Sequence, residues 1–208
     1  MLSIVIASIG MVILPIWEFP STSESSAQVA AFFAHHRSSA EAMMLFYTVG
    51  VTLWMAFGAC VWARLRAALP LDSVIPTLFA AGLVGFVTLL LAGFTCADIL
   101  IYRGDVANAQ LLYDLAFGLL AMSGMPTAIC TGAFTSAALR HRVFARAGGR
   151  LAGATAVAHL LLLASFIVTT GFFSLEGAII IAVPALLWIW ILNTGIEMLR
   201  RPVPTLGA

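Results

Sequence analysis

Charge is what this sequence has least of. Only 9% of its 208 residues are Asp, Glu, Lys or Arg, against about 25% in soluble domains, while 62% are hydrophobic and the mean hydropathy is +1.07. Such a chain cannot cover a soluble fold with polar side chains, so we expect an integral membrane protein. Lysine is absent, and ten arginines supply all the positive charge. Because they fall mostly in short connections, the continuous basic surface of a nucleic-acid-binding protein is not expected.

Cysteine is also scarce, and the usual catalytic motifs are missing. Cys60, Cys96 and Cys130 lie in three different apolar segments at different predicted depths, so free thiols rather than disulfides are expected. The sequence contains no nucleophile elbow, phosphate-binding loop, H-E-x-x-H or paired-cysteine metal motif. The polar connections are too short for a soluble catalytic domain. We therefore lean towards a protein without enzymatic activity and expect no metal.

Long apolar runs are abundant, and about 20 such residues are enough to cross a bilayer as a helix. The sequence predicts an all-α fold, a single transmembrane domain over residues 1–208 with six helices in one bundle. The predicted spans are 2–17, 40–62, 73–102, 108–139, 150–170 and 178–199. The first run has neither a preceding basic region nor a small-x-small cleavage site, so a retained helix is favoured over a signal peptide.

The longest polar stretch, Glu18 to Ser39, is expected to hold a short amphipathic helix outside the membrane, between the first and second spans. Ser25 or Ser26 can cap it. Its apolar face would carry Val29, Phe32 and Phe33. His35 and His36 would close it, and adjacent helical residues point about 100° apart, which disfavours a shared metal.

The arginines predict how the spans are oriented. If the spans alternate, eight arginines fall on one side and only Arg37 and Arg103 on the other. By the positive-inside rule, both termini should then be cytoplasmic, and the membrane should be the bacterial plasma membrane. The use of arginine for every basic residue is typical of proteins encoded by a GC-rich genome.

The charge-free run Leu115 to Leu139 is expected to form a central packing helix. Two rows of small residues follow it at intervals of four, which places each row on one helix face. The packing row is Gly124, Ala128, Gly132 and Ser136. The neighbouring hydroxyl row is Ser123, Thr127, Thr131 and Thr135. Pro126 and Pro184 break backbone hydrogen bonds within two spans, and their kinks could open a small cavity.

Asp98 and Asp114 are the first candidate site, because ionisable groups within spans are functional candidates. They are equally far from the middle of a short helical hairpin, so they should lie at the same depth. Facing one another, they could bind a proton or a cation. Alternatively, Arg103, Tyr102 and Tyr113 satisfy them at the level of the lipid headgroups.

His159 is the second candidate, about 13 Å into its span and close to the middle of the bilayer. The hydroxyls of Thr127 and Thr131 should lie at a similar depth and hydrogen-bond to it across helices, with Asn193 nearer the cytoplasm. A proton relay is an alternative. Haem ligation is another, and it would need a methionine such as Met122 or Met125, because no second histidine lies within a span.

Several short motifs resemble those of a family of six-span integral membrane proteins common in actinobacteria, usually recorded as a domain of unknown function. They are Val29 to Phe33 before His36 and Arg37, Leu112-Tyr113-Asp114, Gly124-Met125-Pro126-Thr127-Ala128, and Gly171-Phe172-Phe173-Ser174-Leu175-Glu176-Gly177. The resemblance implies the topology and the membrane location. It implies no activity and no site residues.

The leading functional hypothesis is a non-catalytic membrane protein. It would be an accessory subunit that packs against other membrane proteins, itself or lipids, or a bundle that holds a lipophilic ligand near the outer leaflet. One alternative is a small-solute or proton-linked transporter using Asp98, Asp114 and His159. Another is a haem- or quinone-linked redox subunit.

Overall fold

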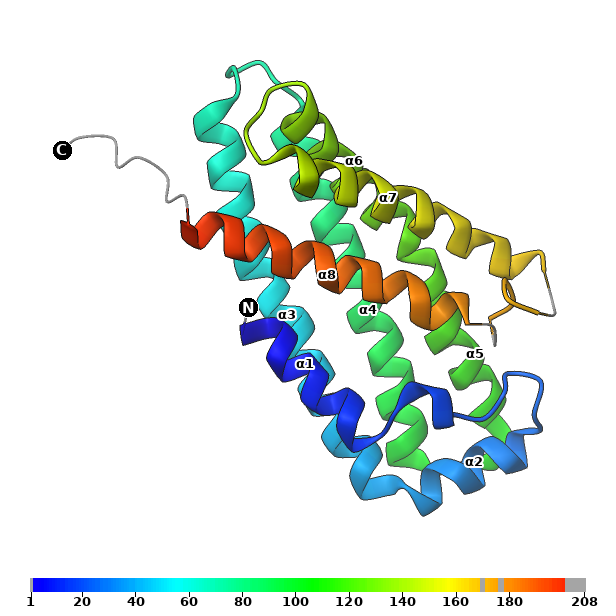
Figure 1. Ribbon diagram of the computed structural model, residues 1–208. Helices are drawn as coiled ribbons and strands as arrows, with labels where there is room; N and C mark the ends of the chain where they lie inside the picture. The colour runs from blue at the N-terminus through cyan, green and yellow to red at the C-terminus, as the bar shows by residue number, and fades with distance from the viewer. Residues whose placement is uncertain (1, 169–170, 176–177, 201–208) are drawn as a thin grey trace.

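The computed structural model describes residues 2–168, 171–175 and 178–200, and it confirms the all-α prediction (Figure 1). Every regular element within these residues is a helix. The α-helices are α1 (Leu2–Ile13), α2 (Ser26–His35), α3 (Arg37–Ala68), α4 (Ile75–Arg103), α5 (Val106–Met122), α6 (Gly124–Leu139), α7 (Arg146–Leu161) and α8 (Ile179–Arg200). There are two short 3-10 helices: η1 (Ile16–Glu18) follows α1 after Pro15, and η2 (Leu162–Phe166) extends α7.

Five of the predicted spans correspond to helical segments that are long and apolar enough to cross a membrane. They are α3, α4, α5 with α6, α7 with η2, and α8. The first predicted span is shorter than expected. Its regular helix α1 has 12 residues, or about 18 Å, because the chain leaves the helix before Pro15, which adopts an extended conformation. The end of the fifth predicted span, residues 169 and 170, lies outside the described residues.

The fourth predicted span is confirmed as one helical segment, Val106–Leu139, which is interrupted at Ser123. α5 ends at Met122 and α6 begins at Gly124. Pro126 has no N–H with which to reach the carbonyl of Met122, four residues earlier, so the helical ladder cannot continue undisturbed. The Ser123 hydroxyl donates to the carbonyl of Leu120 at 2.6 Å and occupies another backbone acceptor at the break.

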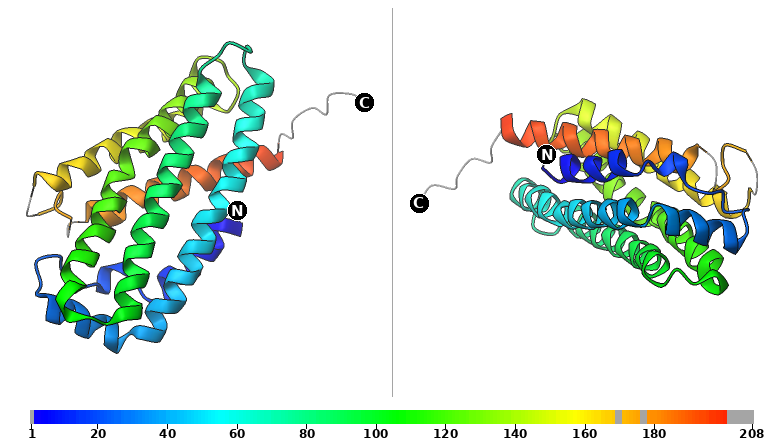
Figure 2. Two further views of the ribbon diagram at one scale, coloured as in Figure 1. Left: turned by 180° about the vertical axis from the view of Figure 1, so that it is seen from behind. Right: turned by 90° about the horizontal axis from the view of Figure 1, so that it is seen from below.

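The helices form two layers that small residues hold together. Seen from below, α1 and α8 lie over the layer that contains α3 and α4 (Figure 2). α1 approaches α3 so closely that a Cβ on Gly50 would lie 2.8 Å from Ala7 Cβ. α4 meets α6 in the same way, since a Cβ on Gly82 would lie 2.6 Å from the backbone nitrogen of Cys130. Close backbone approach at small residues is the usual means of packing membrane helices.

The predicted amphipathic helix is confirmed as α2, which covers one end of the bundle. Ser25 and Gln28 form a reciprocal capping box at its start. Val29 and Phe33 are buried against the ends of the neighbouring helices, where Phe19, Phe32, Phe33, Tyr113 and Phe117 form an aromatic cluster. The Tyr113 hydroxyl donates to the carbonyl of Pro20 at 2.6 Å and holds the connection that precedes α2.

The arginine-bearing helix ends meet at the other end of the bundle, as the predicted alternation requires. The guanidinium of Arg64, near the end of α3, lies 5.0 Å from the centre of the Phe144 ring in the α6–α7 connection. Glu197, near the end of α8, accepts a hydrogen bond from the backbone N–H of Ala145 at 2.7 Å. This carboxylate caps α7 at its N-terminus, where a negative charge is favourable.

Candidate functional site: a side-opening cavity beside His159

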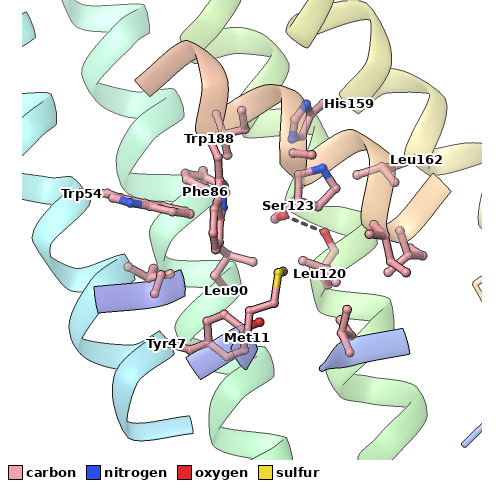
Figure 3. A pocket seen from close by; sticks show the side chains of 18 of the residues that line it. Met11, Tyr47, Trp54, Phe86, Leu90, Leu120, Ser123, His159, Leu162 and Trp188 are labelled. Atoms are coloured by element: carbon pink, nitrogen blue, oxygen red, sulfur yellow. Dashed lines mark hydrogen bonds between the residues drawn. The ribbon is translucent and has the colours of Figure 1, made fainter. Parts of the chain in front are cut away.

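A cavity of about 220 Å³ lies between the two layers (Figure 3). Residues from α1, α3, α4, α5, α7 and α8 line it, and nearly all the lining atoms are apolar. The lining side chains that carry nitrogen or oxygen are those of five residues, Tyr47, Trp54, Ser123, His159 and Trp188. The Trp54 indole stacks on Phe86, with ring centres 5.5 Å apart and planes 12° from parallel.

Three irregularities in the helices surround this cavity. The break between α5 and α6 presents Ser123, the change from α7 to a 3-10 helix presents Leu162, and α8 contributes Pro184. Of the two prolines expected to disturb their spans, Pro184 lines the cavity together with His159, and Pro126 does not. Pro126 packs against α4 instead, where its carbonyl oxygen would lie 2.7 Å from a Cβ on Gly82.

His159 is 2% exposed and forms part of the cavity wall. Its Nδ1 lies 2.8 Å from the carbonyl oxygen of Thr155, one turn earlier on α7. Because a carbonyl has no proton to give, Nδ1 is the donor, and a singly protonated ring then carries a lone pair on Nε2. Among the described residues, the imidazole of His159 makes no other hydrogen bond.

The expected hydrogen bonds from the hydroxyl row to His159 do not form. Thr127 Oγ1 donates to the carbonyl of Ser123 at 2.7 Å, and Thr131 Oγ1 donates to that of Thr127 at 2.8 Å. Both threonines thus satisfy their hydroxyl protons within α6. This is the common behaviour of helical threonines, and it needs no partner on another helix.

The mouth of the cavity lies on the side of the bundle. Most of the lining residues of α3, α4, α5 and α7 are buried or nearly so, whereas the partly or fully exposed ones on the other wall belong to α1, η1 and α8. They include Met11, Ile16, Ile181 and Ala185. α1 and α8 lie on the same face of the bundle (Figure 1), so the cavity opens between them. In a membrane, such an opening faces the hydrocarbon.

A second apolar cavity of about 80 Å³ lies beside the first, on the side of α2. Both cavities share a wall formed by Ile16, Tyr47, Leu90, Phe94 and Leu120. The second one ends beneath Phe19 and Phe33 of the aromatic cluster. The two neighbouring cavities therefore lie between His159 and the underside of the α2 cover.

The other ionisable and polar candidates lie outside this space. Asp98 and Asp114 are both exposed on the bundle surface, and Asp114 accepts a hydrogen bond from Gln110 at 2.9 Å. Neither carboxylate lines the His159 cavity. Asn193 is exposed beside Gly148, at the first turn of α7, so it lies near the arginine-bearing end. The structure therefore separates Asp98, Asp114 and Asn193 from His159.

The four residues of the predicted packing row on α6 do not all contact a neighbouring helix. A Cβ on Gly124 would meet the carbonyl oxygen of His159, so this glycine allows α6 to touch α7. Ala128 is buried, but Gly132 has no neighbouring heavy atom within 4 Å of an added Cβ, and Ser136 is partly exposed. The reason is that α6 packs against α4 on one side and α7 on another. A row of residues at intervals of four therefore does not stay in contact with either helix along its whole length.

The two methionines considered as partners of His159 in the haem alternative lie away from the cavity. Met122 and Met125 are 45% and 42% exposed, and neither lines the cavity. Within the described part of the chain, no three His, Cys, Asp or Glu side chains come together as a metal site.

The fold and the cavity define a membrane-embedded helical bundle with a side-opening apolar cavity. Comparisons of this chain with protein-family models, with curated proteins and with solved structures find no match. Sequence reasoning missed Tyr47, Trp54 and Met11 as cavity residues. Trp54 offered a signal, because a tryptophan in the middle of a span is not at the interface where this residue is usually found.

Proposed function

We propose that the protein binds a lipophilic molecule from the bilayer in the cavity beside His159, without transforming it. The cavity opening between α1 and α8 carries this proposal, because a ligand can pass through it from the hydrocarbon without crossing water. An engineered apolar cavity of about 150 Å³ binds benzene. A cavity of about 220 Å³ can therefore hold a ring or a chain end, while the remainder of the ligand extends into the bilayer.

The predicted orientation would place this binding site in the outer half of the membrane. If the arginine-bearing end is cytoplasmic, α2 is external, and the cavity extends from His159 towards α2. The same orientation keeps both termini in the cytoplasm. Association with other membrane proteins, and the resemblance to the six-span actinobacterial family, remain predictions.

The transporter hypothesis has less geometric support. It requires a polar route that joins the two carboxylates to His159. Asp98 and Asp114 are instead exposed, and the lining of the intervening cavities is apolar. We therefore favour binding over proton-linked transport.

Two alanines of α8 provide a matched test. Ala185 lines the cavity mouth, whereas Ala182 is also exposed but does not line the cavity. Each would be replaced by tryptophan, and the molecules bound to the purified proteins would be compared by native mass spectrometry. Wild type and Ala182→Trp should retain the same lipophilic ligand, and Ala185→Trp should lose it at least about tenfold. Equal retention by both variants would contradict the proposed site.

A further inference from the structure

We infer that the ligand enters with its polar end first and is a neutral lipid alcohol or phenol, whose hydroxyl donates to Nε2 of His159. This inference rests on the proposed function, since it identifies the chemistry of the molecule in the same cavity. It concerns the class of ligand and its direction in the site.

The hydrogen bond between His159 and Thr155 determines what the ring can bind. It occupies Nδ1 as a donor and fixes the ring against its own helix, so Nε2 is left as the acceptor of a side chain that lines the cavity. A buried acceptor without a partner is unfavourable. A ligand hydroxyl would supply the missing donor, and a hydrocarbon chain would not.

Ser123 adds a second preference for a donor. Its hydroxyl proton is already donated to the carbonyl of Leu120, as the dashed line in Figure 3 marks. Its oxygen therefore offers only lone pairs to the cavity, as Nε2 of His159 does. Water would need two to four partners in this apolar space, whereas a lipid alcohol needs one acceptor and an apolar surface for its chain.

The lack of charged side chains in the cavity lining disfavours the binding of the common ionic headgroups there. Among the described residues, no arginine, aspartate or glutamate lines the cavity. A phosphate or carboxylate placed there would be a buried charge without a counter-ion, which is strongly unfavourable. A neutral hydroxyl carries no such cost, so a phospholipid or an ionised fatty acid would not enter with its headgroup first.

The test compares three ligands that differ only at one end, hexadecanol, its methyl ether and hexadecane. Their dissociation constants for the full chain in nanodiscs would be measured by native mass spectrometry. Wild type should bind the alcohol about tenfold more tightly than the ether or the alkane, as expected for one hydrogen bond. The wild-type comparison alone tests the inference, even if a variant fails to fold.

Substitutions at two buried polar residues would show whether His159 causes the preference for the alcohol. His159→Phe should bind all three ligands with similar affinity, because it keeps an apolar ring and removes the acceptor. Ser165→Ala is the matched control, since Ser165 is buried on η2 but does not line the cavity, and it should keep the preference. Equal binding of the three ligands to wild type would overturn the hydroxyl assignment and leave the proposed function intact. Failure of all three to bind would contradict the proposed function itself.

Discussion

Replacing Gly82 with alanine should weaken the contact between α4 and α6. The added Cβ would lie 2.6 Å from the backbone nitrogen of Cys130 and 2.7 Å from the carbonyl oxygen of Pro126. Both neighbours are backbone atoms, so no side-chain rotation can make room. Since non-bonded carbon contacts are most favourable at about 3.5–4.0 Å, the two helices must separate by about 1 Å.

This separation should cost about 1–3 kcal/mol, the usual range for overpacking. A shift of 0.5–1 Å loses a quarter to a half of the dispersion energy of each affected contact. For a chain of this length, about 2 kcal/mol corresponds to a fall of roughly 4–8 °C in the unfolding midpoint. The α4–α6 contact also borders the region where Pro126 breaks the fourth span, so the effect should not be confined to one side chain.

Thermal unfolding followed by circular dichroism in one detergent would measure the change. Gly132→Ala is the matched control on α6, because its Cβ would meet no heavy atom within 4 Å. That substitution should leave the midpoint unchanged or raise it, since alanine favours a helix over glycine by about 1 kcal/mol. If Gly82→Ala is as stable as Gly132→Ala, the reasoning about close backbone contact is wrong.

Three further substitutions test other parts of the fold. Tyr113→Phe removes the hydrogen bond to Pro20 and should cost about 1 kcal/mol, with faster amide hydrogen exchange in the connection before α2; unchanged exchange would show that this bond does not hold the connection. Glu197→Ala removes the carboxylate that accepts from Ala145 and should lower the free energy of unfolding by about 1–2 kcal/mol, so an unchanged value would refute the capping role. Thr194→Val should be neutral or slightly stabilising, because the buried Thr194 hydroxyl has no hydrogen-bond partner among the described residues, and a loss above about 1 kcal/mol would reveal one.

The span positions and α2 could be predicted because their signals are local. A run of about 20 apolar residues forms a helix in lipid almost irrespective of its neighbours. The start of α2 depends on Ser25 and Gln28, which are three residues apart and satisfy one another. The early end of α1 and the interruption of the fourth span at Ser123 were less predictable, although each lies close to a proline, Pro15 and Pro126 respectively.

The arrangement of the candidate site depends on rotation and packing, which the sequence pattern does not define. Equal distance from a hairpin predicts that Asp98 and Asp114 have similar depth, but not that the two helices turn these residues towards one another. The predicted hydrogen-bond partners of His159, Thr127 and Thr131, were wrong. The carbonyl oxygen of Thr155, on the same helix as His159, accepts the hydrogen bond instead. The cavity mouth depends on how α8 crosses the face that also carries α1, and these helices are far apart in the chain.

Photo-crosslinking with a diazirine-bearing long-chain alcohol in native membranes tests the cavity most directly. Leu90 and Leu162 are 5% and 1% exposed and line the cavity, so a probe can label them only from inside it. We expect adducts on these two residues and on Met11 at the mouth, with competition by unlabelled alcohol. Adducts confined to outward-facing residues such as Ile9 and Ile189 would contradict it.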